Sequence, residues 1–469
     1  MDKVPAEILR KIFLETILEL YEYLDEPGYT DPDELPTREY IDRPLCLTHV
    51  CRLWREVAIS FSTLWSYFLI ERDAISRRRH FRSLFDMWLE RSKGAPLSYK
   101  FDIALGATAV YVAKALLSQQ HRWADVEFCW PGEVWADALE NYPDRNFDMT
   151  NMPVLNSLFV YCKFPLHFKI DLSQSARLRK LTLSGDFDLV GKKDALPLLT
   201  SKANLCFSRG KSANDAAHSC LNFLEAACSL EELHVRFEWG PRKSKFAPGT
   251  SKRMVTAPRL RKLMVDSDIG ESRTFLDSVT LPSLKVLQYS TFWSDEPILP
   301  FIKRSLPPLT FLSLSSVERV LEEEPIIEAL RLLPTLEDLR LLHTSISTRF
   351  FRALMVDSTE EGKAKTLCPK LHTLYLRKPQ FSEDATAWGH AFLDMLESRQ
   401  QIMDYFDEVG LSMRQNAWVD VASLRKLSAE DWKEVSNSGR LFVTPYKELR
   451  DAPFTLTADE RIVALLLGD

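Results

Sequence analysis

Two spacings of apolar residues divide the chain into an N-terminal part with helical spacing and a longer part in which apolar residues alternate within short phrases. Near the N-terminus the apolar positions follow the spacing i, i+4, i+5, i+8 and i+9, at Val4, Ile8, Leu9, Ile12 and Phe13. This spacing places all of them on one side of a helix. Pro5 suits the first helical turn, where its missing N–H costs nothing. The pattern therefore predicts a helix over residues 4–20.

A second helical pattern ends in the stretch VCRLWREVAISFSTLW. Its apolar residues recur at i+3, i+4 and i+7, at Leu47, Val50, Cys51, Trp54, Val57 and Ala58. Asp42 and Pro44 are start signals for one helix through Ala58, and a short helix then begins at Ser60 or Ser62. Three short helices bury only a marginal core on their own. We therefore expect this block either to pack on the rest of the chain or to present apolar side chains to a partner.

Between these two patterns lies the segment 21–44, YEYLDEPGYTDPDELPTREYIDRP, which is acidic and rich in turn residues. Pro, Gly, Asp and Tyr punctuate it as a loop. We expect a solvated surface segment, and a regulatory role is the alternative.

From residue 150 onward a phrase of the form Leu-x-x-Leu-x-apolar recurs, usually with Pro two residues ahead. Its first leucines are Leu155, Leu178, Leu230, Leu260, Leu284, Leu309, Leu336 and Leu371. The intervals lie between 23 and 35 residues, except for the 52 residues from Leu178 to Leu230, which is about twice the common interval. We therefore expect one degenerate unit in LPLLTSKANLCFS and a late, poor copy at Leu424.

The alternation within each phrase places both of its apolar residues on one face of a strand. One such strand cannot bury that face alone, but stacked strands form a continuous core. Helical segments between the phrases, such as CLNFLEAA and PIIEALRLL, suit an outer layer. Cruder helix–strand pairs come earlier, in FRSLFDMWLERS then PLSYKFDI, and in VYVAKALLSQQHR then WADVEFCW. The fold class indicated is α/β, with parallel strands on one face and helices on the other, from about residue 75 onward.

The C-terminal segment 380–469 loses the clear repeat but keeps helical patterning in AFLDMLESRQQIMDYF and has an apolar end, RIVALLLGD. We expect it to cap the end of the repeat array, where apolar edge would otherwise be exposed. The alternative is a tail strand or helix folded over the concave face.

Composition narrows the function classes. The chain is 45% hydrophobic and 27% charged, as in ordinary globular proteins, and its net charge of -6 argues against non-specific binding to nucleic acid. No apolar run of about 18 residues occurs, and the N-terminus has no continuous apolar stretch, so we expect neither a membrane span nor secretion. The eight cysteines form no Cys-x-x-Cys pair. They indicate reduced thiols in the cytoplasm or the nucleus.

Motifs for catalysis or cofactor binding are weak. Gly210-Lys211-Ser212 lacks the glycine that a phosphate-binding loop needs five residues earlier, because Leu205 stands there. The nine histidines show no metal-ligand spacing, and no Gly-x-Ser-x-Gly turn occurs. The acidic phrase LEEEP, at 321–325, is typical of a helix start or a solvated face. We expect no cofactor, no metal and no catalytic residue.

The N-terminal block resembles an F-box. The usual pattern is Leu-Pro-x-Glu-Ile-Leu-x-x-Ile-Phe, a spacer, Val-Cys-Arg-x-Trp-Arg, a gap, and Leu-Trp. Val4 replaces the first Leu, and the matching residues are Pro5, Glu7, Ile8, Leu9, Ile12, Phe13, Val50, Cys51, Arg52, Trp54, Arg55, Leu64 and Trp65. The later phrases resemble degenerate leucine-rich repeats. They lack the Asn or Cys ladder that usually follows the strand, so we expect an irregular solenoid. The layout resembles the expanded F-box families of mushroom-forming fungi.

This resemblance implies a domain order: an F-box at 1–70 with the acidic spacer as an insertion, a linker with the first degenerate repeats at 71–150, leucine-rich repeats at 151–379 and a cap at 380–469. It implies a non-catalytic substrate receptor of a ubiquitin ligase. The F-box would dock on a Skp-type adaptor, and through it on a cullin, while the repeats hold an unknown protein substrate. The alternative is an F-box scaffold that assembles proteins outside ubiquitination. Neither function needs nucleic acid or a membrane.

Candidate contact residues follow from both parts. For the adaptor we expect Pro5, Ile8, Leu9, Ile12, Val50, Trp54, Leu64 and Trp65, although some of these must form the internal core. We also expect Trp65 to pack where the F-box meets residues 75–105. For the substrate, strand geometry selects the residue between the two apolar positions, because it points away from the core. These residues are Phe159, Thr182, His234, Met264, Gln288, Ser313, Arg340 and Tyr375.

Overall fold

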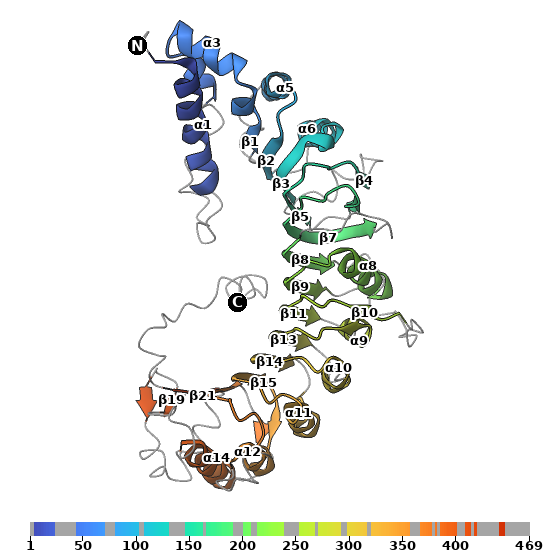
Figure 1. Cartoon of the computed structure of the whole chain (residues 1–469), viewed down its shortest axis with the longest axis vertical. Coiled ribbons are helices and arrows are strands. Elements are labelled where there is room, and N and C mark those ends of the chain that lie inside the picture. Colours follow the sequence, from blue (N-terminus) through green and yellow to red (C-terminus); the bar gives the residue numbers. More distant parts are fainter. Residues whose placement is uncertain are drawn as a thin grey trace. The chain divides into compact units, whose positions relative to one another are not determined.

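The computed structural model describes residues 4–23, 44–70, 80–102, 107–130, 146–162, 166–190, 200–207, 213–238, 253–267, 271–291, 298–316, 320–356, 366–377, 380–381, 385–400, 409–413, 417–419 and 440–445 (Figure 1). These residues fold as two compact units: unit 1 holds the described residues up to 207, and unit 2 holds those from 213 onward. Each unit combines parallel strands with helices. The α/β class that the alternation predicts is therefore confirmed.

Unit 1 begins with short helices: α1 (Ala6–Tyr23), one turn at residues 44–48, α3 (Arg52–Ser60) and the 3-10 helix η1 (Ser62–Trp65). The prediction of one helix from Pro44 to Ala58 is wrong, because residues 49–51 interrupt it. α1 also runs into the segment expected to be a loop, as far as Tyr23. The rest of that acidic spacer, 24–43, lies outside the described residues.

The interruption has a local cause. Cys51 is extended, with φ of -157°, and its sulfur accepts a hydrogen bond from the Trp54 N–H at 3.4 Å, which caps α3. The Arg55 side chain donates to the Thr48 carbonyl at 2.8 Å and so satisfies the end of the preceding helical turn. The apolar spacing gives no sign of this break, because it continues with the same phase on both sides.

Trp65 joins the helical block to the α/β part of unit 1. Its side chain is 1% exposed, and its indole N–H donates to the Ala58 carbonyl at 2.7 Å. The guanidinium of Arg91, on α5 (Phe81–Ser92), lies 4.5 Å from the centre of its ring. The prediction that Trp65 packs against residues 75–105 is confirmed.

The remaining elements of unit 1 alternate between strand and helix as far as β3. Before α5 comes β1 (Tyr67–Ile70), and after α5 come β2 (Leu97–Asp102), α6 (Ala107–Ser118), η2 (Gln120–Arg122), β3 (Trp123–Trp130), β4 (Asn146–Met149), β5 (Ser157–Cys162), β6 (His167–Asp171), β7 (Lys180–Val190) and β8 (Lys202–Phe207). β1, β2, β3, β5, β7 and β8 pair in that order, all parallel. The helices and strands predicted between residues 81 and 130 are all present, and β8 is the degenerate unit expected in LPLLTSKANLCFS.

β7 belongs to two sheets. Its first half pairs with β5 and β8, whereas its second half pairs with β6, which in turn pairs with β4. The strand passes between the sheets at Gly185, where φ is +139° and an added Cβ would lie 2.8 Å from the Cys162 carbonyl oxygen. This second parallel sheet was not predicted, because the repeated phrase covers only the first half of the strand.

In unit 2 each strand of the main sheet is followed by a return segment. The elements are α8 (Ala213–Ala226), β9 (Glu232–Phe237), β10 (Val255–Thr256), β11 (Lys262–Ser267), α9 (Glu271–Asp277), β12 (Val279–Thr280), β13 (Val286–Thr291), α10 (Ile298–Ser305), β14 (Phe311–Ser316), α11 (Glu323–Leu330), β15 (Asp338–Leu342), β16 (Ser345–Ile346), α12 (Thr348–Leu354), β17 (Thr373–Arg377), β18 (Gln380–Phe381) and α14 (Ala385–Gln400). β9, β11, β13, β14, β15 and β17 are parallel neighbours. Helices α8 to α12 line one side of them (Figure 1).

The repeated phrases place their leucines in the core. All eight first leucines, from Leu155 to Leu371, are at most 3% exposed. The turns before the strands form a hydrogen-bond ladder: the N–H groups of Lys285 and Val286 both bond to the Arg261 carbonyl, at 2.8 and 2.9 Å. The same double contact links every neighbouring pair from β9 to β17, and also β5 to β7 and β7 to β8. The ladder satisfies backbone groups that would otherwise be left unpaired beside the core.

The far edge of unit 2 is covered by a last group of strands, β19 (Val409–Met413), β20 (Ala417–Val419) and β21 (Arg440–Pro445). β21 pairs antiparallel with β17, and β19 pairs antiparallel with both β20 and β21. α14 packs on α12 through Phe351 and Phe392, whose ring centres lie 5.4 Å apart. The poor copy expected at Leu424 lies outside the described residues.

Arg399, on α14, ties this region together. Its side chain is 2% exposed and donates to four carbonyls, those of Leu354, Leu367, Cys368 and Leu371, at 2.8 to 3.2 Å. Burial lowers the pKa of Arg399 to about 10. One guanidinium therefore satisfies the end of α12 and the turn before β17.

Candidate interaction surfaces

The predicted adaptor residues separate into an exposed set and a buried set. Pro5 is exposed, Ile8, Ile12 and Val50 are 46%, 49% and 52% exposed, and Trp54 is half-buried. Leu9, Leu64 and Trp65 are buried at 3% or less. The apolar area of these three is already used inside unit 1, so they cannot contact an adaptor in this conformation. The part of the predicted adaptor set that is accessible is therefore smaller than the sequence indicated.

Two members of the exposed set, Ile8 and Ile12, form a stripe on α1, where they are spaced by one helical turn. Val4, four residues before Ile8 and just ahead of α1, is 38% exposed. The opposite side of α1 is buried: Phe13 contacts Trp54 edge to face, with ring centres 4.9 Å apart. Ile59, on α3, is 39% exposed and was not predicted. The sequence could have indicated that Ile59 is exposed, because Ile59 lies outside the i+3, i+4 pattern of Trp54, Val57 and Ala58.

The predicted substrate residues all lie on strands, half-buried between buried neighbours. In unit 1, Phe159 and Thr182 are register partners. In unit 2 the other six form one continuous row across the sheet, in the order His234, Met264, Gln288, Ser313, Arg340 and Tyr375. With neighbouring strands about 4.8 Å apart, this row spans about 24 Å. The structure thus brings together residues that are far apart in the sequence.

Several side chains on the sheet of unit 2 are already engaged with one another. His234 Nε2 lies 2.8 Å from a carboxylate oxygen of Asp266. Arg340 pairs with Asp338 at 3.1 Å, and its guanidinium lies 4.8 Å from the ring centre of Phe311. The contacts of His234 with Asp266 and of Arg340 with Phe311 were not predicted from the sequence, because they depend on strand register. Gln288 and Ser313, in the middle of the row, carry no charge.

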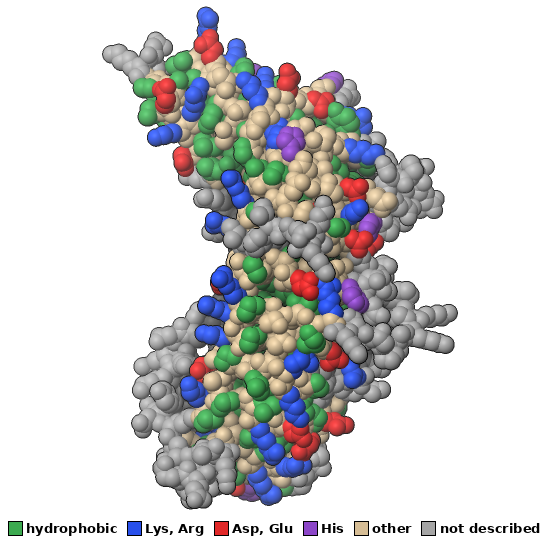
Figure 2. Space-filling model, turned by 45° about the vertical axis from the view of Figure 1, so that its right-hand side comes forward, with side chains coloured by type: hydrophobic (Ala, Val, Ile, Leu, Met, Phe, Trp, Pro, Cys, Tyr) green, Lys and Arg blue, Asp and Glu red, His purple; other side chains and the backbone are tan. Residues whose placement is uncertain are grey.

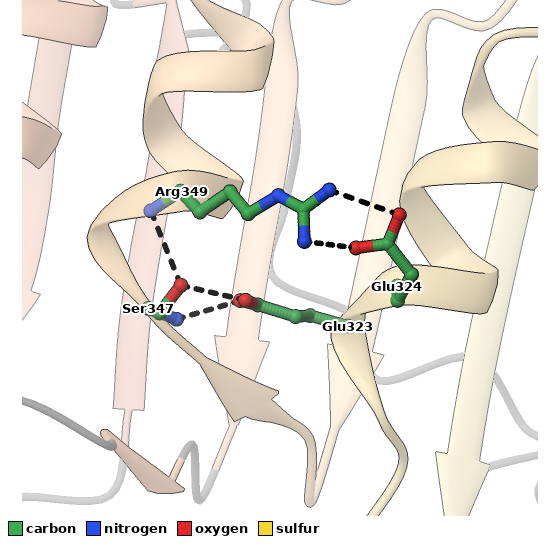
Figure 3. Close-up of polar contacts among 4 residues, drawn as sticks. All are labelled: Glu323, Glu324, Ser347 and Arg349. Carbon is green, nitrogen blue, oxygen red and sulfur yellow. Dashed lines mark hydrogen bonds and ion pairs between the residues drawn. The ribbon is translucent and has the colours of Figure 1, made fainter.

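On the helical side of unit 2 a polar cluster joins α11 to α12 (Figure 3). The Glu323 carboxylate accepts from the Ser347 N–H at 2.7 Å and from its hydroxyl at 2.6 Å, while the Ser347 oxygen accepts from the Arg349 N–H at 3.1 Å. Glu324 pairs with the Arg349 guanidinium. Glu323 begins α11, so the phrase LEEEP starts a helix, one of its two expected readings. Because these groups satisfy one another, the cluster is structural.

The described residues contain no group of His, Cys, Asp or Glu side chains that could hold a metal ion. Within the same residues, no helix is long and apolar enough to cross a membrane. Burial raises the pKa of the Cys220 thiol, and burial also raises the pKa of Cys368 to about 12. Neither thiol is ionised near neutral pH, which a cysteine nucleophile would require.

Charged side chains of both signs lie among hydrophobic ones on the face drawn in Figure 2. No protein-family model matches the chain, and no curated protein matches its sequence. The structure by itself defines a mixed α/β protein with parallel sheets, an exposed apolar stripe on its first helix and a mixed polar face on its strands.

Proposed function

We propose that this protein is the substrate-recognition subunit of a Skp–cullin–F-box ubiquitin ligase. In this proposal the helices of residues 4–65 are an F-box that docks on a Skp-type adaptor. The parallel strands with their helical returns are an irregular leucine-rich-repeat solenoid, whose strand face binds a protein substrate. The protein itself has no catalytic role, and it acts in the cytoplasm or the nucleus.

The observation that carries the proposal is the apolar stripe of Ile8 and Ile12, together with Val50. Ile8 and Ile12 on α1, and Val50 just before α3, are about half exposed, although Phe13 on α1 is fully buried. Exposed apolar side chains gathered on one face are typical of a protein interface. They coincide with residues that match the F-box pattern, which supports an adaptor as the partner.

The proposed role needs no bond chemistry from this chain. A receptor of this kind raises the effective concentration of a substrate lysine near the ubiquitin-charged enzyme and orients it. The row from His234 to Tyr375 supports that role, because it offers hydrogen-bonding, aromatic and charged groups over an extended surface. Such mixed surfaces suit a specific protein partner.

Co-purification tests the proposal. The full chain should retain a Skp-type adaptor and, through it, a cullin. Ile8→Asp combined with Ile12→Asp should weaken adaptor binding by about 30-fold or more, because loss of a central interface contact commonly costs about 2 kcal/mol. Ser83→Asp, at an exposed position of α5, is the matched control and should bind as the wild type does.

Two results would contradict the proposal. Unchanged adaptor binding by the Ile8/Ile12 variant would show that the stripe is not the docking surface. Retention of an adaptor without a cullin would instead favour the alternative, a scaffold that works outside ubiquitination.

A further inference from the structure

The five residues Arg-Leu-Arg-Lys-Leu occur twice, at 177–181 in unit 1 and at 259–263 in unit 2. Both copies adopt the same local structure. The first leucine is buried, at Leu178 and at Leu260, and the N–H groups of the second arginine and the lysine bond to one carbonyl of the preceding turn. That carbonyl belongs to Asn156 in unit 1 and to Glu231 in unit 2. The two copies therefore differ in their surroundings and hardly in their own fold.

In unit 2 the copy faces acidic neighbours. Glu231 is exposed on the turn that Arg261 bonds to, and Glu232 is the register partner of Lys262 on β9. On the opposite side the neighbouring turn carries Lys285. Two carboxylates thus stand against the cations of this copy and offset part of their charge.

In unit 1 the same copy faces neutral and basic neighbours. Lys180 has two register partners, Ser157 on β5 and Lys202 on β8. The other outward residues of β5, of residues 180–184 and of β8 contain no carboxylate: they are Phe159, Tyr161, Thr182, Ser184, Asn204 and Cys206. Asp125 is the first acid in the row of Lys180; it lies beyond Ser157 and accepts a hydrogen bond from Ser98 at 3.3 Å.

These cations are held close together by the backbone. The Arg179 N–H donates to Asn156, and the Arg179 carbonyl accepts from the N–H groups of Ser201 and Lys202, at 3.0 and 3.4 Å. Lys180 and Lys202 stand side by side on neighbouring strands, about 4.8 Å apart along the sheet. Arg177, Arg179 and Lys180 are exposed, and none of the three pairs with an acid among the described residues. No carboxylate of the described residues therefore offsets the charges of Arg177, Arg179 and Lys180.

We propose that this edge of unit 1, formed by Arg177, Arg179 and Lys180, binds an acidic segment of a protein partner through its carboxylates or phosphates. The proposal rests on the proposed function, in which the segment belongs to the substrate. A nucleic acid is the less favoured ligand, because the chain carries a net charge of -6 and the site has only these three cations. Since the hydrogen-bond ladder already fixes the backbone of Arg179 and Lys180, mainly side chains have to be ordered when the anion binds.

Fluorescence anisotropy with the full chain tests this site. Three labelled peptides of equal length serve as probes: one has alternating Glu and Ser, the second has phosphoserine in place of Ser, and the third has Gln in place of Glu. The fourth probe is a single-stranded DNA with as many negative charges as the Glu peptide. The Glu and phosphoserine peptides should bind, more weakly as salt rises, and the Gln peptide should not. Arg179→Glu with Lys180→Glu should weaken that binding at least tenfold. The matched variant, Arg261→Glu with Lys262→Glu, changes the same two residues of the second copy and should weaken it less than threefold.

Three results would overturn the site. These are equal losses in the two variants, absence of binding by both acidic peptides, and tighter binding of the DNA than of the acidic peptides. Adaptor capture is measured on the same preparations. Loss of peptide binding with adaptor capture intact defeats only this inference, whereas failure of adaptor capture by the wild type defeats the proposed function.

Discussion

The two units use the same strand and turn, but the returns around β5 and β7 in unit 1 differ from those of unit 2. The earlier returns of unit 1 contain the helices α5 and α6, as the returns of unit 2 do. In unit 2 the returns after β11, β13, β14 and β15 each contain a helix, α9, α10, α11 and α12. In unit 1 the segment before β5 contains the strand β4, and the return from β5 to β7 is the strand β6, which joins the second half of β7 in another sheet. The hydrogen-bond ladder between turns is nevertheless the same in both units.

The difference follows from apolar spacing in the return segments. In unit 1 buried residues alternate, as in Phe147 and Met149 and in Phe168 and Ile170, which gives one apolar face to a strand. In α10 the buried Ile298, Phe301 and Ile302 are spaced as on a helix. The phrase Leu-x-x-Leu-x-apolar therefore determines the stacked sheet, and the segment between phrases is free to be helix or strand.

The largest expected effect concerns the helical end of unit 2. Arg399→Met keeps the apolar stem of the side chain but removes its donors to four buried carbonyls, of which that of Cys368 still accepts from the Leu371 N–H, at 2.9 Å. We expect the free energy of unfolding to fall by about 3–5 kcal/mol, since removing a buried charged partner has costs of this size. Urea unfolding measures the change, and hydrogen exchange should locate it in β17 and α12. Arg331→Met, at an exposed position, should change stability by less than about 0.5 kcal/mol. Equal effects of the two variants would remove Arg399 from its central role.

The next prediction tests the second sheet of unit 1, formed by β4, β6 and the second half of β7. Gly185→Ala places a Cβ against the Cys162 carbonyl at a backbone conformation that side chains rarely adopt. We expect a loss of about 2–3 kcal/mol, with faster hydrogen exchange in β6 and the second half of β7. Gly94→Ala is the control, because an added Cβ there meets nothing within 4 Å. If Gly185→Ala is as stable as Gly94→Ala, β7 does not depend on glycine to enter two sheets.

The smallest effect is a pH dependence that arises from the Cys220 thiol of unit 2. Burial raises the pKa of Cys220 above the ordinary value of 9.0. Above pH 9 the unfolded chain therefore releases a proton that the folded chain keeps, so stability falls as pH rises. The slope per thiol approaches about 1.4 kcal/mol per pH unit. Cys220→Ala should make the decline between pH 9 and 11 shallower by that amount, whereas Cys228→Ala, which removes an exposed thiol, should leave it unchanged. A decline of equal slope in both variants would contradict the assignment.

Much of the fold could be predicted from the sequence, because strand and core follow from local apolar spacing. The phrase identified the strands and their buried leucines, and the interval of 52 residues indicated where β8 lies. The break at Cys51 could not be predicted, since it depends on a sulfur cap and on a side chain four residues further on. The second sheet of unit 1 was missed for a similar reason, because the phrase says nothing about the segments between its copies.

For the candidate surfaces, the sequence predicted which strand residues point outward, but it did not predict which side chains surround them. Strand alternation selected the outward residues correctly, and register then aligned them into rows. Which apolar residues of the N-terminal block face outward could not be decided from spacing, because Leu9 and Ile8 are adjacent and fit the same helix. The pairing of His234 with Asp266 joins residues 32 positions apart and needed the register of β9 and β11.

The strand β21 has a consequence for how molecules of this protein meet one another. A parallel sheet that ended at β17 would offer a row of unpaired N–H and C=O groups to any other extended chain, including a second copy of itself. β21 covers the part of that row from Leu374 to Arg377 with an antiparallel partner from the same chain. Its direction is opposite to that of the strands it joins, so the stacking of parallel strands cannot continue across it from one molecule to the next. This part of the edge of β17 is thus already paired within the chain and is not available to a second molecule.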